Sequence, residues 1–255
     1  EEKMSDAYNL RELFQGTVLR EGYPRNTVFF DGDRGLKMKE NLGFEGCQLS
    51  LYMPTFRGRS DSVKEEEYIS QVRDHLSRLD HLLEDNQILL VKLHPFVQNL
   101  LPVDNYKHIR SFPSEYDTYE VLNACDVLIT DYSSVMYDYA NTGRKIILFA
   151  YDREEYLSER GMYEDIIGYP FPVVSSPEEI AAELQEHSGC PDRAFLEKYC
   201  TYERAEATSC ICRHILLHEN ACNEYKMPGT KKKKVLLYAG SLKPNGITTA
   251  YFSLL

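Results

Sequence analysis

Two adjacent serines, with an aspartate one helical turn later, stand where a buried strand ends in the stretch CDVLITDYSSVMYDYANTG, Cys125–Gly143. Ser133 and Ser134 fall at the predicted start of a helix, where unpaired backbone N–H groups and the positive end of the helix dipole favour a phosphate. Asp138 follows on the same face, so its carboxylate suits a sugar hydroxyl. The alternative is structural: Ser133 caps the helix and Asp138 is a polar surface residue.

A histidine follows another buried strand, in QILLVKLHP, Gln87–Pro95. At this strand end His94 could contact a phosphate or take part in acid–base catalysis, although a lone histidine is more often a structural residue. Lys92 projects from the same face of the strand, where it could supply positive charge or lie along the sheet edge.

Two arginines are candidates for bidentate recognition of phosphate: Arg25 in EGYPRN and Arg57 in PTFRG. Either could equally be a surface residue. The chain contains neither a Walker A sequence nor a G-x-G-x-x-G motif. This absence disfavours the NTPase and dinucleotide-binding classes.

The elements that must position these residues alternate along the chain. Apolar runs predict strands, and the capped or amphipathic stretches between them predict helices. The strands are expected at 47–55, 87–95, 108–113, 126–130, 145–150 and 171–174, and the helices at 65–86, 117–125, 133–143 and 175–187. Strands that are apolar throughout and separated by helices imply a parallel sheet covered on both faces, so the predicted fold is α/β and doubly wound. Its ligands should bind at the carboxyl ends of the strands.

Composition sets the class of protein. The 255 residues are 43% hydrophobic and carry a formal net charge of −11, which is typical of a globular protein and argues against nucleic-acid binding. No apolar run has the length of a membrane span, and no signal peptide opens the chain. Seven cysteines without the spacing of a disulfide framework favour reduced thiols and a cytoplasmic protein.

A cluster of cysteines and histidines near the end of the chain could suggest a metal site. Its members are Cys200, Cys210, Cys212, His214, His218 and Cys222. Cysteines two residues apart point to different faces of a helix, and neither zinc-ligand spacing nor a His-Glu-x-x-His pattern occurs. Buried thiols and surface histidines are therefore favoured over a metal.

The tail changes character after the last of these cysteines. Residues 223–234, NEYKMPGTKKKK, are polar and predict a linker. Residues 235–255 restart the pattern with one strand, a loop and a helix, too little to bury a core alone. We expect them to be the truncated start of a second domain that resembles a glycosyltransferase.

Four stretches in order carry a family resemblance: Gly22–Asn26 (GYPRN), Leu51–Gly58 (LYMPTFRG), Val91–Pro95 (VKLHP) and Cys125–Asp152. Together they resemble the CDP-glycerol glycerophosphotransferase family, the teichoic acid polymerases and primases, over roughly Tyr8–His218. The last motif is long and specific, and the short ones gain weight from their order.

The resemblance implies two facing Rossmann-like domains in the GT-B arrangement, with the donor nucleotide held by the second. It implies transfer of glycerol phosphate, or a related polyol phosphate, from CDP-glycerol to a hydroxyl of a cell-wall or capsular polymer. CMP is released and no metal or other cofactor is required. The parent protein would then be cytoplasmic, either free or peripheral on the inner face of the membrane.

Carried onto this sequence, the resemblance predicts which residues contact the donor. Ser133 and Ser134 should hold the pyrophosphate, and His94 should stabilise charge or protonate the leaving group at the phosphoryl centre. The predicted donor contacts are Arg25, Pro54, Thr55, Lys92, Leu93, His94, Ser133, Ser134 and Asp138.

The sequence also departs from the family pattern. Thr27 and Gly58 stand where the family usually has acidic residues. The family's first domain, which carries a His-Gly motif, is absent. We therefore expect residues 1–30 to be a connection from that domain and residues 31–222 to be the donor-binding domain, which binds CDP-glycerol weakly without turning it over.

Two rival interpretations remain open from the sequence. The chain could be the nucleotide-sugar-binding half of a GT-B glycosyltransferase. It could also be a non-catalytic domain that binds protein partners, in which the helix start at Ser133 is only structural.

Overall fold

The computed structural model describes residues 9, 14, 16–57, 62–94, 97, 100–103, 105–162 and 164–227, with side chains from residue 66 onward in the helix that opens the second long range. The chain divides into two units. One comprises Glu21–Cys222, and the other combines Glu1–Arg20 with Asn223–Leu255.

The larger unit is built on a six-stranded sheet in the order β4-β3-β2-β5-β6-β7, with every neighbouring pair parallel. Its strands are β2 (Gln48–Tyr52), β3 (Gln87–Val91), β4 (Ile109–Ser111), β5 (Val127–Thr130), β6 (Lys145–Phe149) and β7 (Val173–Val174). Numbered along the chain this is the 3-2-1-4-5-6 order of a Rossmann-like sheet. The predicted α/β, doubly wound parallel sheet is confirmed, and each predicted strand is present.

The strands are apolar throughout because both faces of the sheet are covered. In β6, for example, Ile146 and Leu148 face one core while Ile147 and Phe149 face the other. A strand exposed on one face would alternate apolar and polar residues instead. Neighbouring residues of one strand thus contribute to two separate cores.

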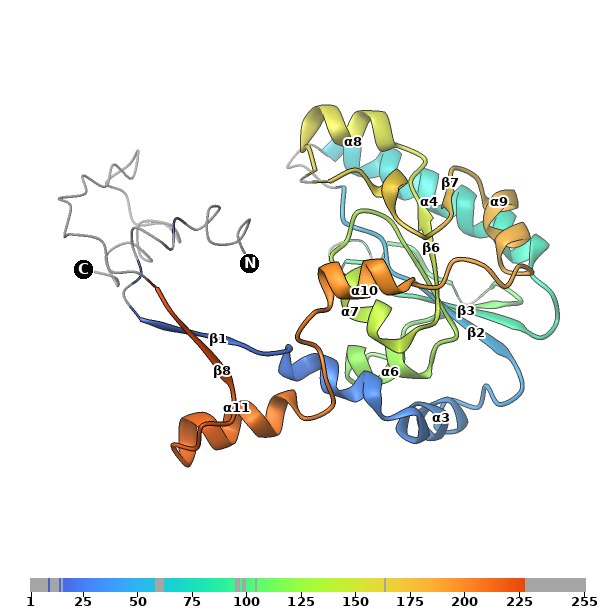
Figure 1. Ribbon diagram of the computed structural model, residues 1–255. Coiled ribbons are helices and arrows are strands. Elements are labelled where there is room, and N and C mark those ends of the chain that lie inside the picture. The colour runs from blue at the N-terminus through green and yellow to red at the C-terminus, as the bar shows by residue number, and fades with distance from the viewer. Residues whose placement is uncertain are drawn as a thin grey trace. The chain divides into compact units, whose positions relative to one another are not determined.

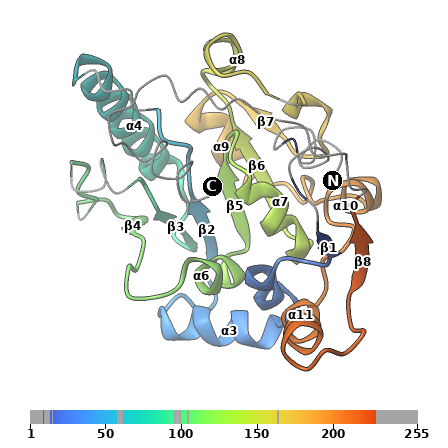
Figure 2. The ribbon, with the colours of Figure 1, turned by 90° about the vertical axis from the view of Figure 1, so that its left-hand side faces the viewer.

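Helices cover both faces (Figures 1 and 2). The helices α4 and α9 pack on one core, whereas α3, α6, α7 and the 3₁₀ helix η1 pack on the other. The helices of this unit are η1 (Pro24–Phe30), α3 (Gly32–Asn41), α4 (Ser62–Leu82), α6 (Thr118–Ala124), α7 (Val135–Tyr139), η2 (Ala140–Thr142), α8 (Arg153–Glu159), η3 (Ile166–Gly168), α9 (Pro177–Glu183), α10 (Arg193–Tyr199) and α11 (Ala207–Leu216). The prediction missed α3, α8 and α10; α3 and α8 lack a clear apolar stripe in their sequences.

Local signals set several helix ends as predicted. The Asp117 carboxylate caps α6 by accepting from the backbone N–H groups of Tyr119 and Glu120. Ser176 caps α9, with Pro177 in its first turn. The helix predicted over 133–143 is shorter: α7 ends at Tyr139, η2 continues it, and Gly143 closes it with a left-handed φ of 69°.

The smaller unit contains an antiparallel pair of strands, β1 (Thr17–Arg20) and β8 (Asn223–Lys226). Its register places Leu19 opposite Glu224, and the guanidinium of Arg20 lies 4.3 Å from the ring centroid of Tyr225. Residues 223–226 therefore form a strand, where the sequence predicted the beginning of a linker. The rest of that linker, from residue 228, and the expected second domain at 235–255 lie outside the described residues.

The larger unit also begins earlier than expected. Its boundary is at Glu21, and η1 packs against α6 and α11. The family resemblance placed residues 1–30 in a connection from a preceding domain. Val28 and Phe29 are in fact buried and anchor η1 to the domain.

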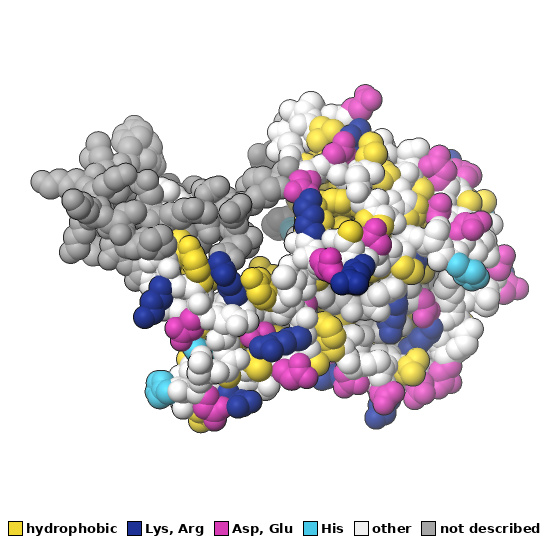
Figure 3. Space-filling model, in the orientation of Figure 1, with side chains coloured by type: hydrophobic (Ala, Val, Ile, Leu, Met, Phe, Trp, Pro, Cys, Tyr) yellow, Lys and Arg dark blue, Asp and Glu magenta, His cyan; other side chains and the backbone are white. Residues whose placement is uncertain are grey.

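On the face shown in Figure 3, acidic and basic side chains of the described residues are interspersed. Within the described part of the chain, no helix combines the length and the apolar character needed to cross a bilayer.

Candidate functional site

The loops after β2 and β5 meet at the point where the strand order reverses, which is where ligands bind in an open parallel sheet. The backbone N–H of Thr55 donates to both carboxylate oxygens of Asp131 at 3.0 and 2.9 Å, and the Thr55 hydroxyl donates to one of them at 2.7 Å. Asp131 is buried. Its carboxylate therefore fixes the Pro54–Thr55 turn against the loop that carries Ser133 and Ser134.

Arg57 joins a third loop to these two. Its Nη2 lies 2.8 Å from Asp131, and its side chain also pairs with Asp152, which follows β6. The Tyr132 hydroxyl donates to Asp152 at 3.0 Å. Burial acts to lower the pKa of Arg57, but the hydrogen bond to Asp152 and the charges of both carboxylates outweigh it and raise that pKa. Arg57 therefore pairs with two carboxylates of the protein itself. It is neither the surface residue nor the open phosphate ligand that the sequence suggested.

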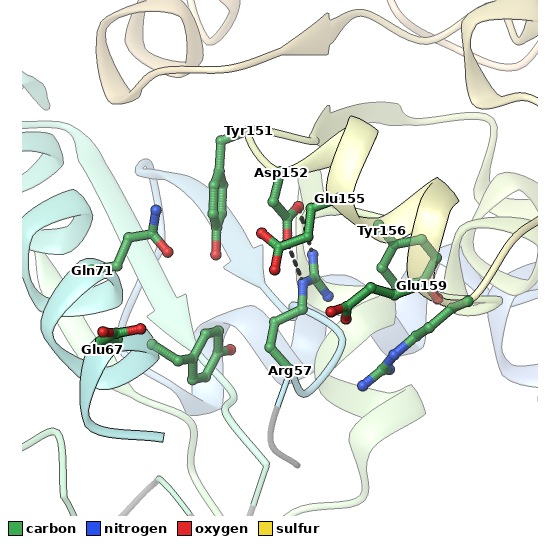
Figure 4. A pocket seen from close by; sticks show the side chains of 10 residues that line it. Arg57, Glu67, Gln71, Tyr151, Asp152, Glu155, Tyr156 and Glu159 are labelled. Carbon is green, nitrogen blue, oxygen red and sulfur yellow. Dashed lines mark hydrogen bonds and ion pairs between the residues drawn. The ribbon is translucent and has the colours of Figure 1, made fainter. Parts of the chain in front are cut away.

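A pocket of about 340 Å³ opens beside Arg57, between α4 and α8 (Figure 4). Carboxylates and phenol rings line it, among them Glu67, Tyr68, Glu155 and Glu159. Burial raises the pKa of Tyr68 to about 12, so its hydroxyl stays a proton donor. Such a lining suits hydroxyl or amine groups and repels phosphate.

Ser133 and Ser134 lie at the carboxyl edge, directly before α7. Ser134 is the N-cap residue, but its side chain makes no capping hydrogen bond and is exposed. Ser133 Oγ accepts from the backbone N–H of Val135 only at 3.4 Å. Helix capping alone therefore does not explain why two serine hydroxyls lie at this helix start.

Asp138 is buried, so the interpretation of it as a polar surface residue is wrong. Its carboxylate accepts from Arg25 Nη2 at 3.1 and 3.3 Å, from Asn26 Nδ2 at 3.0 Å and from the Tyr119 hydroxyl at 2.8 Å. Three protein donors therefore occupy this carboxylate. The predicted sugar-hydroxyl contact would have to use the remaining acceptor capacity of the Asp138 carboxylate.

The three residues that follow β3, Lys92 to His94, have different surroundings. His94 is exposed and its ring stacks on Phe56, with centroids 4.6 Å apart and planes 15° apart. Lys92 Nζ lies 3.9 Å from the centroid of Phe112, and burial lowers its pKa. Leu93 is buried in the core under α4. Its side chain faces away from any ligand at this edge.

Metal ligands do not gather in the part of the chain that the structure describes: it contains no group of three or more His, Cys, Asp or Glu side chains able to hold an ion. All seven cysteines are free thiols, and Cys125 and Cys222 are buried. Cys210 is half-buried and Cys212 is exposed, so these two thiols of the cysteine–histidine cluster differ in their surroundings, as expected for residues two apart on α11.

Sequence reasoning missed Asn26, Tyr119, Asp131 and Asp152. The two aspartates carry a usable signal, since each directly follows or nearly follows a buried strand at the ligand-binding edge. Asn26 and Tyr119 carry none, because only the folded chain brings them to Asp138.

This Rossmann-like parallel sheet is of the kind found in nucleotide-binding α/β domains, which hold their ligands at the switch point. Residues 2–217 match the family model of CDP-Glycerol:Poly(glycerophosphate) glycerophosphotransferase. The chain belongs to this family, as its motifs predicted.

Two curated relatives illustrate the family. The chain is 29% identical over 222 residues to the teichoic acid ribitol-phosphate polymerase TarL of Staphylococcus aureus, which covers 83% of this chain and 38% of the relative. It is 29% identical over 214 residues to a teichoic acid poly(glycerol phosphate) polymerase of Bacillus spizizenii, which covers 80% of this chain and 54% of the relative. The chain thus spans about half of these relatives or less.

A solved structure agrees with both. The wall teichoic acid polymerase TagF superposes with a TM-score of 0.67 at 28% identity, covering 80% of this chain and 52% of that chain. A TagF variant soaked with CDPG superposes with a TM-score of 0.66.

Proposed function

We propose that this chain is the donor-binding half of a polyol-phosphate transferase, which takes glycerol phosphate from CDP-glycerol and adds it to a hydroxyl of a cell-wall or capsular polymer. The observation that carries the proposal is the Ser133–Ser134 pair beside the turn that Thr55, Asp131 and Arg57 hold at the switch point. Ser133 is half-buried and Ser134 is exposed. Family membership supplies the reaction class.

In this proposal, the pyrophosphate lies on the backbone N–H groups and hydroxyls of Ser133 and Ser134. Pro54 and Thr55 border it, because the Thr55–Asp131 hydrogen bonds fix that turn beside the serines. Lys92 adds positive charge from the neighbouring strand end. Leu93 can contribute only through its backbone, since its side chain is in the core.

The transfer itself is an in-line displacement at the phosphorus that bears glycerol. The acceptor hydroxyl oxygen forms a bond to that phosphorus, the bond to the bridging oxygen breaks, and CMP leaves with the electron pair. His94 stabilises or protonates the leaving oxygen, which suits an exposed imidazole at this edge. The proton of the acceptor goes to a base in a preceding domain, which completes a GT-B arrangement in the whole protein.

Ribitol phosphate is the second candidate for the transferred group. The observation that favours it is the similarity to ribitol-phosphate polymerases, one of which is 34% identical over 177 residues. We place the whole protein in the cytoplasm, peripheral on the inner face of the membrane, where a polymer acceptor grows. The present chain alone should bind donor without turnover.

Calorimetric titration of the chain with CDP-glycerol, CDP-ribitol, CMP and UDP-sugars tests the proposal. The expected order places a CDP-polyol first. Tighter binding of a UDP-sugar would identify a glycosyltransferase half instead. If no nucleotide binds, even to a longer chain that restores the preceding domain, a non-catalytic domain is the better interpretation.

Replacing Ser133 and Ser134 together by alanine tests the pyrophosphate contact. The expected loss is about 2–4 kcal/mol of binding free energy, because hydrogen bonds to a charged group contribute about 1.5–3 kcal/mol each and are not fully additive. Ser158→Ala is the matched control, since this hydroxyl on α8 only donates to the backbone carbonyl of Glu155. An unchanged affinity for CDP-glycerol in the double variant would leave the serines without a ligand.

A further inference from the structure

Arg25 is held in one orientation by the protein. Its Nη2 donates to the buried Asp138 carboxylate, and its guanidinium lies 4.6 Å from the ring centroid of Tyr23 and 5.7 Å from that of Tyr119. Its side chain nevertheless remains 49% exposed. Within the described residues, the hydrogen bonds of Arg25 use Nη2 alone. The other guanidinium N–H groups are left for a ligand.

Arg25 borders a pocket of about 520 Å³ formed by η1, the start of α3 and the start of α6. Two arginines and three acidic residues line it, namely Arg25, Arg34, Asp31, Asp117 and Glu120. Arg34 already pairs with Glu120, and Arg25 with Asp138. The lining therefore has no surplus of positive charge for a phosphate, but it offers both donors and acceptors beside aromatic rings.

This pattern matches a nucleobase rather than a phosphate. Cytosine presents two adjacent acceptors, O2 and N3, to which a guanidinium can donate a parallel pair of hydrogen bonds. It also presents an exocyclic amino group, which a carboxylate can accept. Uracil has an N3–H where cytosine has an acceptor, and a carbonyl where cytosine has its amino group. It would therefore place a donor against the guanidinium and a carbonyl oxygen against the carboxylate.

We infer that Arg25 is the residue that reads the cytosine base of the donor and makes the site selective for cytidine over uridine nucleotides, with Asp117 as the acceptor for the amino group. This inference rests on the proposed function. Arg25 is linked to the serines through Asp138, because Asp138 lies on α7, the helix that begins directly after Ser134. A nucleotide can then have its pyrophosphate on the serines and its base beside Arg25.

The test compares cytidine, CMP, UMP and CDP-glycerol binding to the 255-residue chain and to two variants, Arg25→Met and Arg25→Lys, by NMR and calorimetric titration. Both variants should weaken cytidine and CMP roughly tenfold to hundredfold and leave UMP nearly unchanged, because the lost bonds are specific to cytosine. The lysine variant keeps the charge but loses the planar pair of donors, so it should also lose the preference for CMP over UMP.

Arg78→Met is the matched control, since Arg78 makes an exposed ion pair with Glu178 on the other face of the sheet. It should leave every affinity unchanged. Equal weakening of CMP and UMP with unchanged cytidine binding would make Arg25 a phosphate ligand and overturn the inference while the proposed function stands. If the unmodified chain binds no cytidine ligand at all, the proposed function fails as well.

Discussion

Arg57 and Arg25 both pair with a buried aspartate near the carboxyl edge of the sheet, yet their surroundings differ. Arg57 is 13% exposed and lies between two carboxylates, Asp131 and Asp152, whose side chains are 2% and 14% exposed. Arg25 is 49% exposed and meets one carboxylate, Asp138. Arg57 links three loops, whereas the hydrogen bonds of Arg25 within the described residues leave some of its guanidinium N–H groups available.

The difference separates an arginine that shapes a site from one that can bind in it. A guanidinium with a carboxylate on two sides gains little from a ligand, since its charge is already compensated. One that is oriented by a single carboxylate and two rings is preorganised for a further partner. Position in the sequence motif does not reveal this, because both arginines occur in short polar stretches that follow a proline.

The largest effect is expected when Arg57, the buried one of the two arginines, is replaced. Arg57→Met leaves Asp131 and Asp152 without their cation, and removal of one partner from a buried ion pair typically costs about 3–5 kcal/mol. Urea denaturation of the chain should show a loss of that size in the free energy of unfolding.

Arg153→Met is the control for this substitution, because Arg153 pairs with Asp165 near the surface. It should cost less than about 1 kcal/mol. Comparable losses for the two variants would mean that Arg57 is not the structural arginine of the comparison.

A second prediction concerns the walls of the Arg25 pocket, where α3 packs closely on α6. A Cβ on Gly35 would lie 2.4 Å from the backbone carbonyl oxygen of Asn123. Gly35→Ala should therefore lower the free energy of unfolding by about 1–3 kcal/mol, despite the better helix propensity of alanine. Gly32→Ala in the same helix meets no atom within 4 Å and should be harmless. Equal thermal midpoints for the two variants would contradict this close approach.

Much of the fold could be predicted from the sequence. Runs such as Gln87–Val91 and Lys145–Phe149 are apolar at every position that a two-sided parallel sheet buries, and Asp117 and Ser176 mark helix starts by local chemistry. The helix α3 escaped prediction because it contains two glycines and only two large apolar residues in ten. Its stability comes from packing on α6, which is a long-range contact.

The candidate site was only partly predictable. Strand ends pointed to Thr55, His94 and Ser133, and these lie at the carboxyl edge as expected. The role of Asp138 could not be read from its spacing, since its partners Arg25 and Asn26 lie more than 110 residues away along the chain. The burial of Leu93 shows the same limit, because a motif does not tell which of its residues faces the core.

A third prediction sharpens the comparison from the side of Arg25. Arg25→Met should cost only about 1 kcal/mol of stability, because the arginine is half exposed and Asp138 keeps the donors of Asn26 and Tyr119. Denaturant unfolding next to Arg57→Met gives the contrast directly. A loss as large as that of Arg57→Met would make Arg25 a second structural arginine, with little left over for a ligand.

The smallest expected effect lies behind Arg25, at Glu203. Burial and the charge of Asp138 raise the pKa of Glu203, and its Oε2 is buried without a hydrogen-bond partner among the described residues, as is Oδ1 of Asn26. A carboxyl group whose pKa is higher in the folded chain than in the unfolded chain stabilises the fold when it is protonated. Its contribution is complete at a pH below the unfolded-state pKa and is lost as the pH rises through the folded-state pKa. Glu203→Gln supplies an N–H in place of the missing proton, while its carbonyl still accepts from the backbone N–H of Tyr23.

The Glu203→Gln variant should match the unmodified chain near pH ~4 and exceed it by up to about 1 kcal/mol at pH ~7, measured by urea denaturation across that range. Glu206→Gln, at an exposed glutamate next to α11, should show no such divergence. A stability difference for Glu203→Gln that stays constant with pH would mean that Glu203 titrates like a solvated carboxylate.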